Sequence, residues 1–318
     1  MNRLYEIAGV TKQAMHQHEA RHSYIQMEAE SILAVVNEIR EEHPKMGCRK
    51  IYYLMNPDQW GRDAFEQLLL ANGYRVKYDP NFIRTTYSQN QYYFPDLTKG
   101  LELTNINQLW ATDITYYFVN GKFFYLTFIV DVYSRRIIGY HVSNSLHAEA
   151  NLKALQMAFK TRKRTIFPGL IHHSDRGSQF IDKAYQKMIN KAQMKISMCN
   201  QAWENPFAER VNGIIKQEYL NCWQIDSGEM LIKATKQSLT SYNFNRPHWS
   251  LLNKMTPVNF EKYLLTLDAQ QRPKVKLYTD GNESLTRHRA TSDFAQQTPS
   301  GLLCPMDFEV DSVHKKVN

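Results

Sequence analysis

The stretch LWATDITYYFVNGKFFYLTFIVD, residues 109–131, decides the fold of this chain. Two runs rich in aromatic and β-branched residues flank Asn120-Gly121. Such a dipeptide is a strong hairpin signal, because both turn positions need positive φ. We therefore predict two antiparallel strands on either side of this turn. Asp113 interrupts the first strand, and a carboxylate there is costly unless it is paired or bound to a metal.

The chain beyond this hairpin has the pattern of strands alternating with helices. Three antiparallel strands, a crossover helix and two further strands make a mixed α/β domain. The ends of its first and fourth strands adjoin if the crossover brings the fourth strand beside the first. After the hairpin, the predicted strands are 135–142, 169–174 and 195–198, and the predicted helices are 146–162, 180–194, 204–221, 229–244 and one that begins at Thr256-Pro257.

Two more carboxylates fall close to the predicted sheet. Asp175 ends the strand in IHHSDRGSQF (171–180), and Glu209 lies in the first turn of a helix that begins at an Asn-Pro pair. Three oxygen ligands from two strands and a nearby helix would suit Mg²⁺ or Mn²⁺, which prefer hard carboxylates. Taken singly, Asp113 could pair with an arginine, Asp175 could cap the next helix, and Glu209 could be an exposed acid.

Basic residues near these positions suggest a polyanionic partner. Lys216 lies seven positions after Glu209, which at about 3.6 residues per turn returns it to the same helix face and aims a cation toward a phosphate. Residues 101–200 carry 13 basic and 6 acidic side chains, a surplus that favours DNA binding, with a solvated surface as the alternative explanation. The densest part of this surplus includes Arg162, Lys163 and Arg164.

Composition narrows the class of protein. The length of 318 residues suggests about two domains, and 43% hydrophobic with 22% charged residues allows a sizeable core. The four cysteines form no CxxC pair, so neither a zinc finger nor a disulfide framework is implied, which fits a reducing cytoplasm. No apolar run approaches the roughly 18 residues of a membrane span, and the N-terminus lacks a signal-peptide core.

The region before the α/β domain is predicted to contain helices and a linker. Apolar residues at helical spacing predict helices at 27–42, 46–55 and 61–74. Three short helices with tight turns suggest a helix-turn-helix DNA-binding module, although a generic helical bundle has the same pattern. The predicted organisation is an N-terminal arm (1–30), this all-α module (31–78), a linker (79–104), the α/β domain (105–265) and a polar C-terminal tail (266–318).

Three blocks of the sequence resemble one known family. WATDITY (110–116), HHSDRGSQF (172–180) and ENPFAERVNGIIKQE (204–218) are similar to the three catalytic blocks of large-subunit transposases of bacterial insertion sequences. These enzymes have a retroviral-integrase catalytic core with a ribonuclease-H-like fold. The resemblance extends over about residues 45–262 and includes DVYSRRIIGYHV (131–142), YNFNRPHWSLLNKMTPVNF (242–260) and a helix-turn-helix segment at 46–76.

The resemblance implies a catalytic site. Asp113, Asp175 and Glu209 would be the catalytic triad and the metal ligands, with Lys216 as the associated basic residue. It implies two Mg²⁺ (or Mn²⁺) ions that support cleavage of a phosphodiester and then strand transfer by the freed 3′-hydroxyl. Gly177 is expected to let the chain turn away close to bound DNA.

Some residues of the blocks lie outside this triad. The resemblance leaves out Asp131, which also ends a strand, and we expect it to pair with Arg135 or Arg136. The loop before Glu209 is slightly shorter than is usual in the family, and Glu204 stands where the family often has aspartate. These differences concern the loop and leave the predicted ligands unchanged.

The predicted function is that of a DDE transposase, which cuts and joins DNA at the ends of a mobile insertion element. The intact triad argues against a catalytically silent or domesticated protein that only binds DNA ends. The helix-turn-helix module and the YNFNRPH block argue against a ribonuclease-H-like nuclease that cuts without joining. The resemblance further implies a homo-oligomer on DNA, a helix-turn-helix protein or fusion from a small upstream reading frame, no membrane, and a bacterial cytoplasmic location with the nucleoid.

Overall fold

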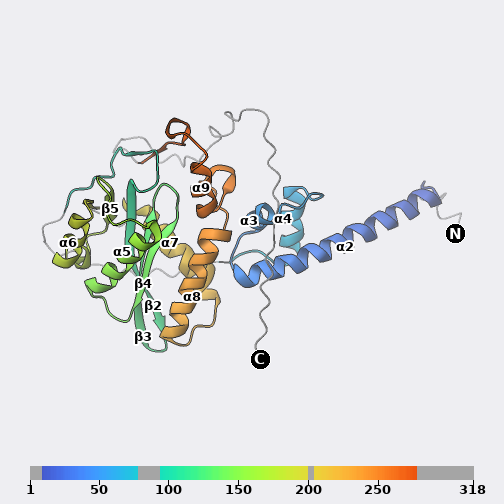
Figure 1. Ribbon diagram of the computed structural model, residues 1–318. Coiled ribbons are helices and arrows are strands. Elements are labelled where there is room, and N and C mark those ends of the chain that lie inside the picture. Colours follow the sequence, from blue (N-terminus) through green and yellow to red (C-terminus); the bar gives the residue numbers. More distant parts are fainter. Residues whose placement is uncertain (1–8, 78–93, 200–203, 278–318) are drawn as a thin grey trace, which may run out of the picture. The chain divides into compact units, whose positions relative to one another are not determined.

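The structure is a computed structural model that describes residues 9–77, 94–199 and 204–277. Within these ranges, three helices precede a five-stranded sheet that has helices on both faces (Figure 1). The elements are α2 (Lys12–Glu42), α3 (Cys48–Met55), α4 (Arg62–Ala71), β1 (Glu102–Leu103), β2 (Leu109–Val119), β3 (Lys122–Asp131), β4 (Ile137–Ser143), α5 (Ala148–Arg162), β5 (Ile171–Ser174), η1 (Ser178–Phe180), α6 (Lys183–Lys191), β6 (Lys195–Met198), α7 (Pro206–Ile214), η3 (Ile215–Tyr219), η4 (Leu220–Cys222), α8 (Gly228–Thr240), η5 (Ser241–Asn245), η6 (Leu252–Lys254), α9 (Pro257–Leu264), η7 (Ala269–Gln271) and β7 (Val275–Lys276).

The sheet has the strand order β4-β3-β2-β5-β6, so the fourth strand of the domain does lie beside the first. β2, β3 and β4 are antiparallel, whereas β5 and β6 run parallel to β2. The hairpin between β2 and β3 turns at Asn120 and Gly121, whose φ angles of 44° and 79° confirm the predicted turn. The sequence therefore predicts both the hairpin and the mixed character of the sheet.

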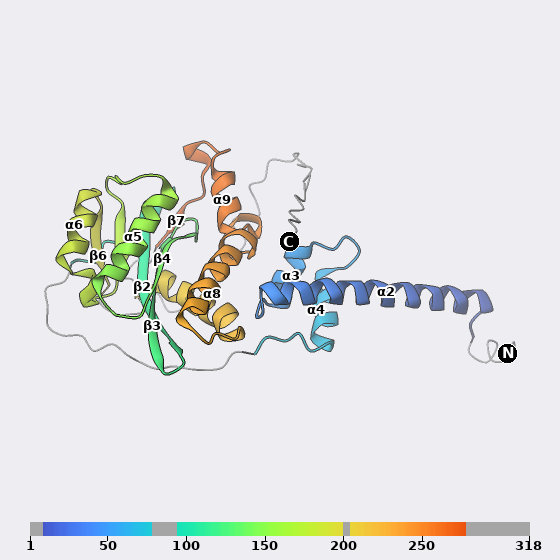
Figure 2. The ribbon, with the colours of Figure 1, turned by 60° about the horizontal axis from the view of Figure 1, so that its bottom comes forward.

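Alternate side chains of β2 enter two separate cores. Ala111 packs with residues of α7 and α8 on one face of the sheet, and Trp110 packs with residues of α5 and α6 on the other. Figure 2 shows α5 and α8 on opposite sides of the strands. Because side chains alternate along a strand, Asp113 lies on the same face as Ala111 and is directed toward α7.

Helix α5 approaches the sheet closely at Gly139. A Cβ atom at this position would lie 2.3 Å from the carbonyl oxygen of Ala154 and 3.1 Å from the Cβ atom of Ala158. Only glycine allows this approach, and the two alanines of α5 are fully buried against the strand. The close contact fixes α5 on the face opposite α7.

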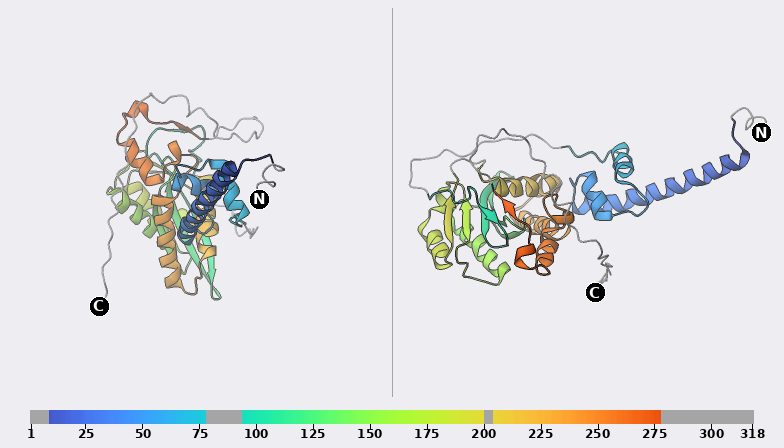
Figure 3. Two further views of the ribbon diagram at one scale, coloured as in Figure 1. Left: turned by 90° about the vertical axis from the view of Figure 1, so that its right-hand side faces the viewer. Right: turned by 90° about the horizontal axis from the view of Figure 1, so that it is seen from above.

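The three N-terminal helices bury a small core of their own. Each predicted helix is present, but α2 has 31 residues and begins at Lys12, not at residue 27 (Figure 3). The hydroxyl of Thr11 accepts a hydrogen bond from the amide of Ala14 and caps this longer helix. α2 therefore crosses the predicted boundary between arm and module at residue 30. Neither α2 nor another helix in the described ranges is apolar enough over a sufficient length to cross a membrane.

The α/β domain extends beyond the predicted boundary at residue 265. After α9, β7 pairs antiparallel with β1 and aligns Val275 with Leu103, and the side chain of Leu277 is buried in the same core. Residues 266–277 are therefore part of the domain and not of a polar tail. The sequence did not reveal this boundary, because a two-residue strand has no periodic pattern. The remainder of the predicted tail, residues 278–318, and residues 78–93 of the predicted linker lie outside the described residues.

Candidate active site

Asp113 of β2 is held by one hydrogen bond to each carboxylate oxygen. Its Oδ1 accepts the backbone amide of Ile114 at 2.9 Å, and its Oδ2 accepts the side-chain amide of Asn212, on α7, at 2.8 Å. Burial, followed by the charges of Asp175 and Glu209, raises the pKa of Asp113 from 3.8 to about 8. The three predicted ligands are therefore close enough to act on one another electrostatically.

Asp175 follows β5 and is brought level with Asp113 by the strand register. β2 and β5 are parallel and pair Ala111 with His173, and Asp113 and Asp175 each lie two positions after that pair. The amide of Gly177 donates to Oδ1 of Asp175 at 3.0 Å, and burial raises the pKa of this carboxyl group.

Position 177 is occupied by glycine for a different reason from the one predicted. Its φ is −62°, which any residue adopts, so the turn itself does not need glycine. A Cβ atom at Gly177 would lie 3.0 Å from Oδ1 of Asp175 and 2.8 Å from Oε1 of Gln179. The absence of a side chain therefore leaves room for the carboxylate of Asp175.

Glu209 lies in the first turn of α7, as the sequence predicts. Pro206 is at the start of the helix, and the side-chain amide of Asn205 donates to the carbonyl oxygen of Thr112 at 2.9 Å. This bond ties the beginning of α7 to β2, one residue before Asp113. The side chain of Glu209 is exposed at the surface, and partial burial of its carboxyl group raises its pKa.

The donor set fits a hard divalent cation. The three carboxylates come from the same region of two strands and a helix, and Oδ1 of Asn212, whose amide group binds Asp113, is a buried oxygen without a hydrogen-bond partner. In the part of the chain that the structure describes, no three His, Cys, Asp or Glu side chains converge closely enough to hold one ion. Like charges repel one another, so carboxylates that await a cation are expected to stand apart.

Two asparagines of this site were missed by the sequence analysis. Asn212 orients Asp113, and Asn205 fixes the start of α7 on β2. The signal for Asn212 was present, since it lies three positions after Glu209 and therefore on the same helix face. No comparable signal existed for Asn205, whose partner is a backbone carbonyl 93 positions away in sequence.

Lys216 reaches the same strand, although not through a regular helix. Its Nζ donates to Oγ1 of Thr115 at 3.2 Å and lies 5.0 Å from the ring centroid of Tyr116, and burial lowers its pKa. Thr115 lies on the same face of β2 as Asp113. The predicted seven-residue alignment assumed an uninterrupted α-helix, but α7 ends at Ile214 and Lys216 belongs to the π-helical turn η3.

The prediction that Arg162 binds DNA is wrong. Its guanidinium donates to Asp131 at 2.7 Å and to both oxygens of Glu261 at 2.8 Å, and its side chain is only 6% exposed. Asp131 is therefore paired with Arg162, not with Arg135 or Arg136 as expected, and Arg136 pairs with Glu261 instead. Both terminal nitrogens of Arg162 are engaged by carboxylates, and its remaining donor, Nε, is buried, so the side chain is not accessible to a phosphate.

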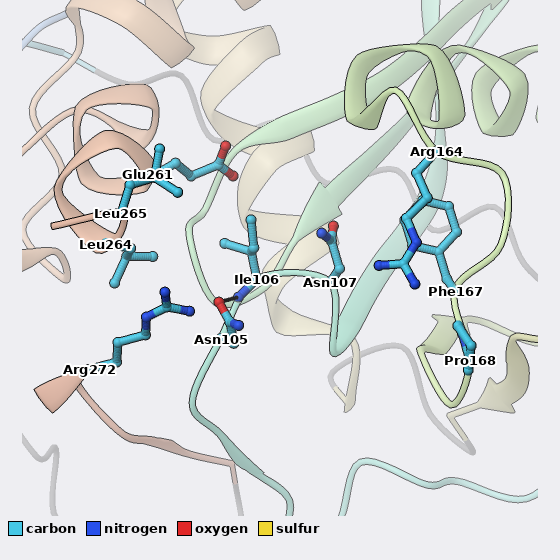
Figure 4. A pocket seen from close by; sticks show the side chains of 10 residues that line it. All are labelled: Asn105, Ile106, Asn107, Arg164, Phe167, Pro168, Glu261, Leu264, Leu265 and Arg272. Atoms are coloured by element: carbon cyan, nitrogen blue, oxygen red, sulfur yellow. Dashed lines mark hydrogen bonds between the residues drawn. The ribbon is translucent and has the colours of Figure 1, made fainter. Parts of the chain in front are cut away.

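Lys163 and Arg164 are both exposed. Lys163 ends α5 with a φ of 51°, and the guanidinium of Arg164 lies 5.3 Å from the ring centroid of Phe167. Figure 4 shows Arg164 and Arg272 directed into a pocket of about 350 Å³. The pocket is lined by residues that precede β2 and β5, so it lies at the edge of the sheet opposite Asp175.

Comparison with known proteins identifies the family. The Integrase core domain family matches residues 104–202, and a second Integrase core domain family matches residues 190–257. The chain is 32% identical over 209 residues to the insertion element IS600 uncharacterized 31 kDa protein of Shigella sonnei, with 64% of this chain and 76% of that protein covered. The chain belongs to the bacterial insertion-sequence transposases. The transposase is also 28% identical over 227 residues to the transposase for insertion sequence element IS629 of Shigella sonnei, with 70% and 75% covered.

The family determines the class of reaction. The transposase is an enzyme that cuts and joins DNA, and its five-stranded mixed sheet with flanking helices is the ribonuclease-H-like core predicted from the sequence. Among solved structures, the HTLV-2 integrase catalytic core domain in complex with magnesium (trimeric form) is similar with a TM-score of 0.41 and 20% identity, and 52% of this chain and 99% of that chain are covered.

The raised pKa of Asp113 predicts an unusual dependence of stability on pH. Without metal, the folded transposase keeps the Asp113 proton up to about pH 8, whereas the unfolded chain loses it near 3.8, so the free energy of unfolding falls as pH rises between these values. Asp113→Asn removes the titrating group and should stabilise the metal-free protein by roughly 5 kcal/mol at pH 8, and much less at pH 5. Chemical unfolding with a chelator present measures this difference.

Metal provides the control for this prediction. Adding Mg²⁺ at pH 8 should raise the stability of the parent protein and leave Asp113→Asn unchanged. An equal pH dependence of unfolding in the two proteins would show that Asp113 is not held in a repulsive cluster.

Proposed function

We propose that Asp113, Asp175 and Glu209 are the catalytic triad of the transposase and hold its divalent metal ions. The arrangement of the three residues carries the proposal: Asp113 lies on β2, Asp175 directly follows the neighbouring parallel strand β5, and Glu209 lies in the first turn of α7, which Asn205 ties to β2. Negative charge concentrated at one edge of the sheet attracts a cation, and the substrate is itself an anion that such a site would repel without one.

The metal set that suits these residues is a pair of Mg²⁺ or Mn²⁺ ions. When bound, such ions supply the activation of water and the stabilisation of the leaving oxygen in phosphodiester cleavage. The chain supplies orientation: Asn212 fixes one oxygen of Asp113, and the amide of Gly177 fixes one oxygen of Asp175. Glu209, exposed in the first turn of α7, is free to move toward the other two.

The reaction proposed at this site has two steps on DNA. Water attacks the phosphodiester at the element end, the bond to the 3′ oxygen breaks, and a 3′-hydroxyl is freed. That hydroxyl then attacks a target phosphodiester: a new bond forms between it and the target phosphorus, and the bond to the target's 3′ oxygen breaks and frees a 3′-hydroxyl there. The second step therefore joins the strands without a covalent protein intermediate. The intact set of three carboxylates supports this reaction over a silent DNA-end binder, and no observation favours a nuclease that only cuts.

Several cations are proposed to contact the DNA backbone. Lys216 contacts Thr115, two residues after Asp113 on the same face of β2, and suits the strand that is cut. Lys163 and Arg164 are exposed at the far edge of the sheet, and Arg272 shares the pocket of Arg164, so these residues suit a second stretch of DNA. Their contribution would be a salt-dependent contact with phosphates.

The domain organisation suggests how the ends are recognised. The three N-terminal helices, including the predicted module 31–78, are proposed to bind the element end, while residues from β1 to β7 carry out the chemistry. The family resemblance supports a homo-oligomer on paired DNA ends and a second helix-turn-helix protein, or fusion, from an upstream reading frame. The proposed site of action is the DNA of the bacterial nucleoid.

Substitution of the three carboxylates tests the proposed function. Asp113→Asn, Asp175→Asn and Glu209→Gln should each abolish metal-dependent cleavage of labelled DNA from the element end, because each removes a metal ligand. DNA affinity should stay within about twofold, because it comes mostly from phosphate contacts elsewhere. Asp226→Asn, which changes an exposed carboxylate of the same domain, is the control and should cleave normally. Normal cleavage by a triad variant would remove that residue from the site.

Lys216 tests the proposed contact with the cut strand. Lys216→Ala should slow cleavage and lower the salt slope of end binding by about 1, because one phosphate contact is lost. Lys216→Arg should retain more activity, since a point charge is the main requirement. Lys187→Ala, an exposed lysine on α6, is the matched control. If Lys216→Ala and Lys187→Ala both behave as the parent protein does, Lys216 has no role in DNA binding.

A further inference from the structure

The YNFNRPHW block, residues 242–249, is not part of the site described above. α8 continues into the π-helical turn η5, and Arg246 follows that turn directly. The side chain of Arg246 is 2% exposed and that of His248 is 7% exposed, so neither is available for DNA. Two buried basic residues outside the active site need another explanation.

Arg246 forms a buried ion pair with the turn that carries Lys216. Its Nε and Nη2 donate to the two carboxylate oxygens of Glu218 at 2.8 Å each. Glu218 and Lys216 both belong to η3, and a π-helical turn has one extra residue, which rotates the side chains that follow it. Glu218 is thereby buried against Arg246 while Lys216 lies on β2, so the ion pair holds the turn that positions Lys216.

The N-terminal helices are attached to the same turn. Nζ of Lys50, on α3, lies 3.6 Å from a carboxylate oxygen of Glu218. Nδ1 of His43 lies 2.9 Å from the hydroxyl of Tyr219, and the amide of Lys45 donates to the carbonyl oxygen of Glu218 at 3.4 Å. Each of these contacts ends on η3, the continuation of the helix that bears Glu209.

The second π-helical turn and the block after it add further contacts. The carboxylate of Glu42 accepts hydrogen bonds from Ser241 and Asn245 of η5. Nζ of Lys254 lies 3.8 Å from the ring centroid of Tyr53, on α3. The N-terminal helices therefore have two polar attachments to the α/β domain, which together we call the junction. One is at η3, and the other is at η5 and the block that follows it.

We infer that Glu218 and Arg246 are positioning residues that join the N-terminal helices to α7, which bears Glu209, and to η3, which bears Lys216. The inference rests on the proposed function, in which those N-terminal helices bind the element end. A fixed junction sets the distance between bound DNA and the carboxylates, and so selects the phosphodiester that is cut. Stability alone would not require an ion pair here, because apolar residues of similar volume are often as stable in a buried position.

A substitution on the α3 side tests the junction without disturbing the core of the α/β domain. Lys50→Met keeps the apolar stem and removes the charge that reaches Glu218. Arg49→Met is the matched control, because Arg49 is the neighbouring residue of α3, is 58% exposed and pairs with Glu66 of α4. Lys254→Met weakens the attachment from the other side and should act in the same direction as Lys50→Met.

The full-length proteins are compared by two activities with the same metal ion. One is cleavage of labelled element-end DNA at its end position, and the other is non-specific nicking of plasmid DNA. Lys50→Met and Lys254→Met should lower the ratio of the first to the second roughly tenfold, with misplaced cuts on the end DNA, because small misplacements of a reacting group lower rates strongly. End-binding affinity should change by less than about twofold, and Arg49→Met should keep the parent ratio.

The ratio separates positioning from stability. A substitution that only unfolds part of the protein lowers both activities in proportion, and an unchanged ratio in Lys50→Met and Lys254→Met would overturn the inference. Failure of the proposed function has a different signature, because the parent protein itself would then show no metal-dependent cleavage of end DNA. If the parent protein cleaves end DNA and both variants keep its ratio of end cleavage to non-specific nicking, only the positioning role of the junction is rejected.

Discussion

The repulsion between Asp113, Asp175 and Glu209 is the constraint on which the site depends. Burial, together with the charges of Asp175 and Glu209, raises the pKa of Asp113 to about 8, so the three groups do not all ionise readily without a compensating cation. The fold nevertheless keeps the carboxylates together, because β5 pairs in parallel with β2 and α7 begins on β2. Stability is lowered here so that a metal-dependent reaction can occur, a trade-off common at active sites.

Polar contacts between one helix and one strand organise the surroundings of the triad. Four hydrogen bonds join residues 205–220 to the segment 112–117 of β2, and the pairs are Asn205 with Thr112, Asn212 with Asp113, Lys216 with Thr115, and Leu220 with Tyr117. These contacts fix the register of helix and strand, so the amide of Asn212 and the ammonium of Lys216 are held on β2 at Asp113 and Thr115. The π-helical turn is the adjustment that keeps Lys216 on this line while Glu218 faces the N-terminal helices.

Local sequence patterns predicted the fold, whereas contacts between residues far apart in the sequence could not be predicted. Asn120-Gly121 fixed the hairpin, and the short strand before Asp175 was sufficient to place that carboxylate at the sheet edge. The partner of Asp131 could not be predicted, because Arg162 reaches it from the end of another helix and shares it with Glu261. The two-residue strands have no periodic pattern, so they were not predicted. The π-helical turns have none either, so the sequence did not predict the junction at Glu218.

The position of bound metal tests the central claim most directly. Crystals of the transposase soaked in Mn²⁺ would show it by anomalous scattering. We predict a Mn²⁺ peak between Asp113 and Asp175, with Glu209 drawn toward it and the amide of Asn212 still on Asp113. A peak bound by other residues, or none at a Mn²⁺ concentration at which the protein cleaves DNA, would contradict the proposed site.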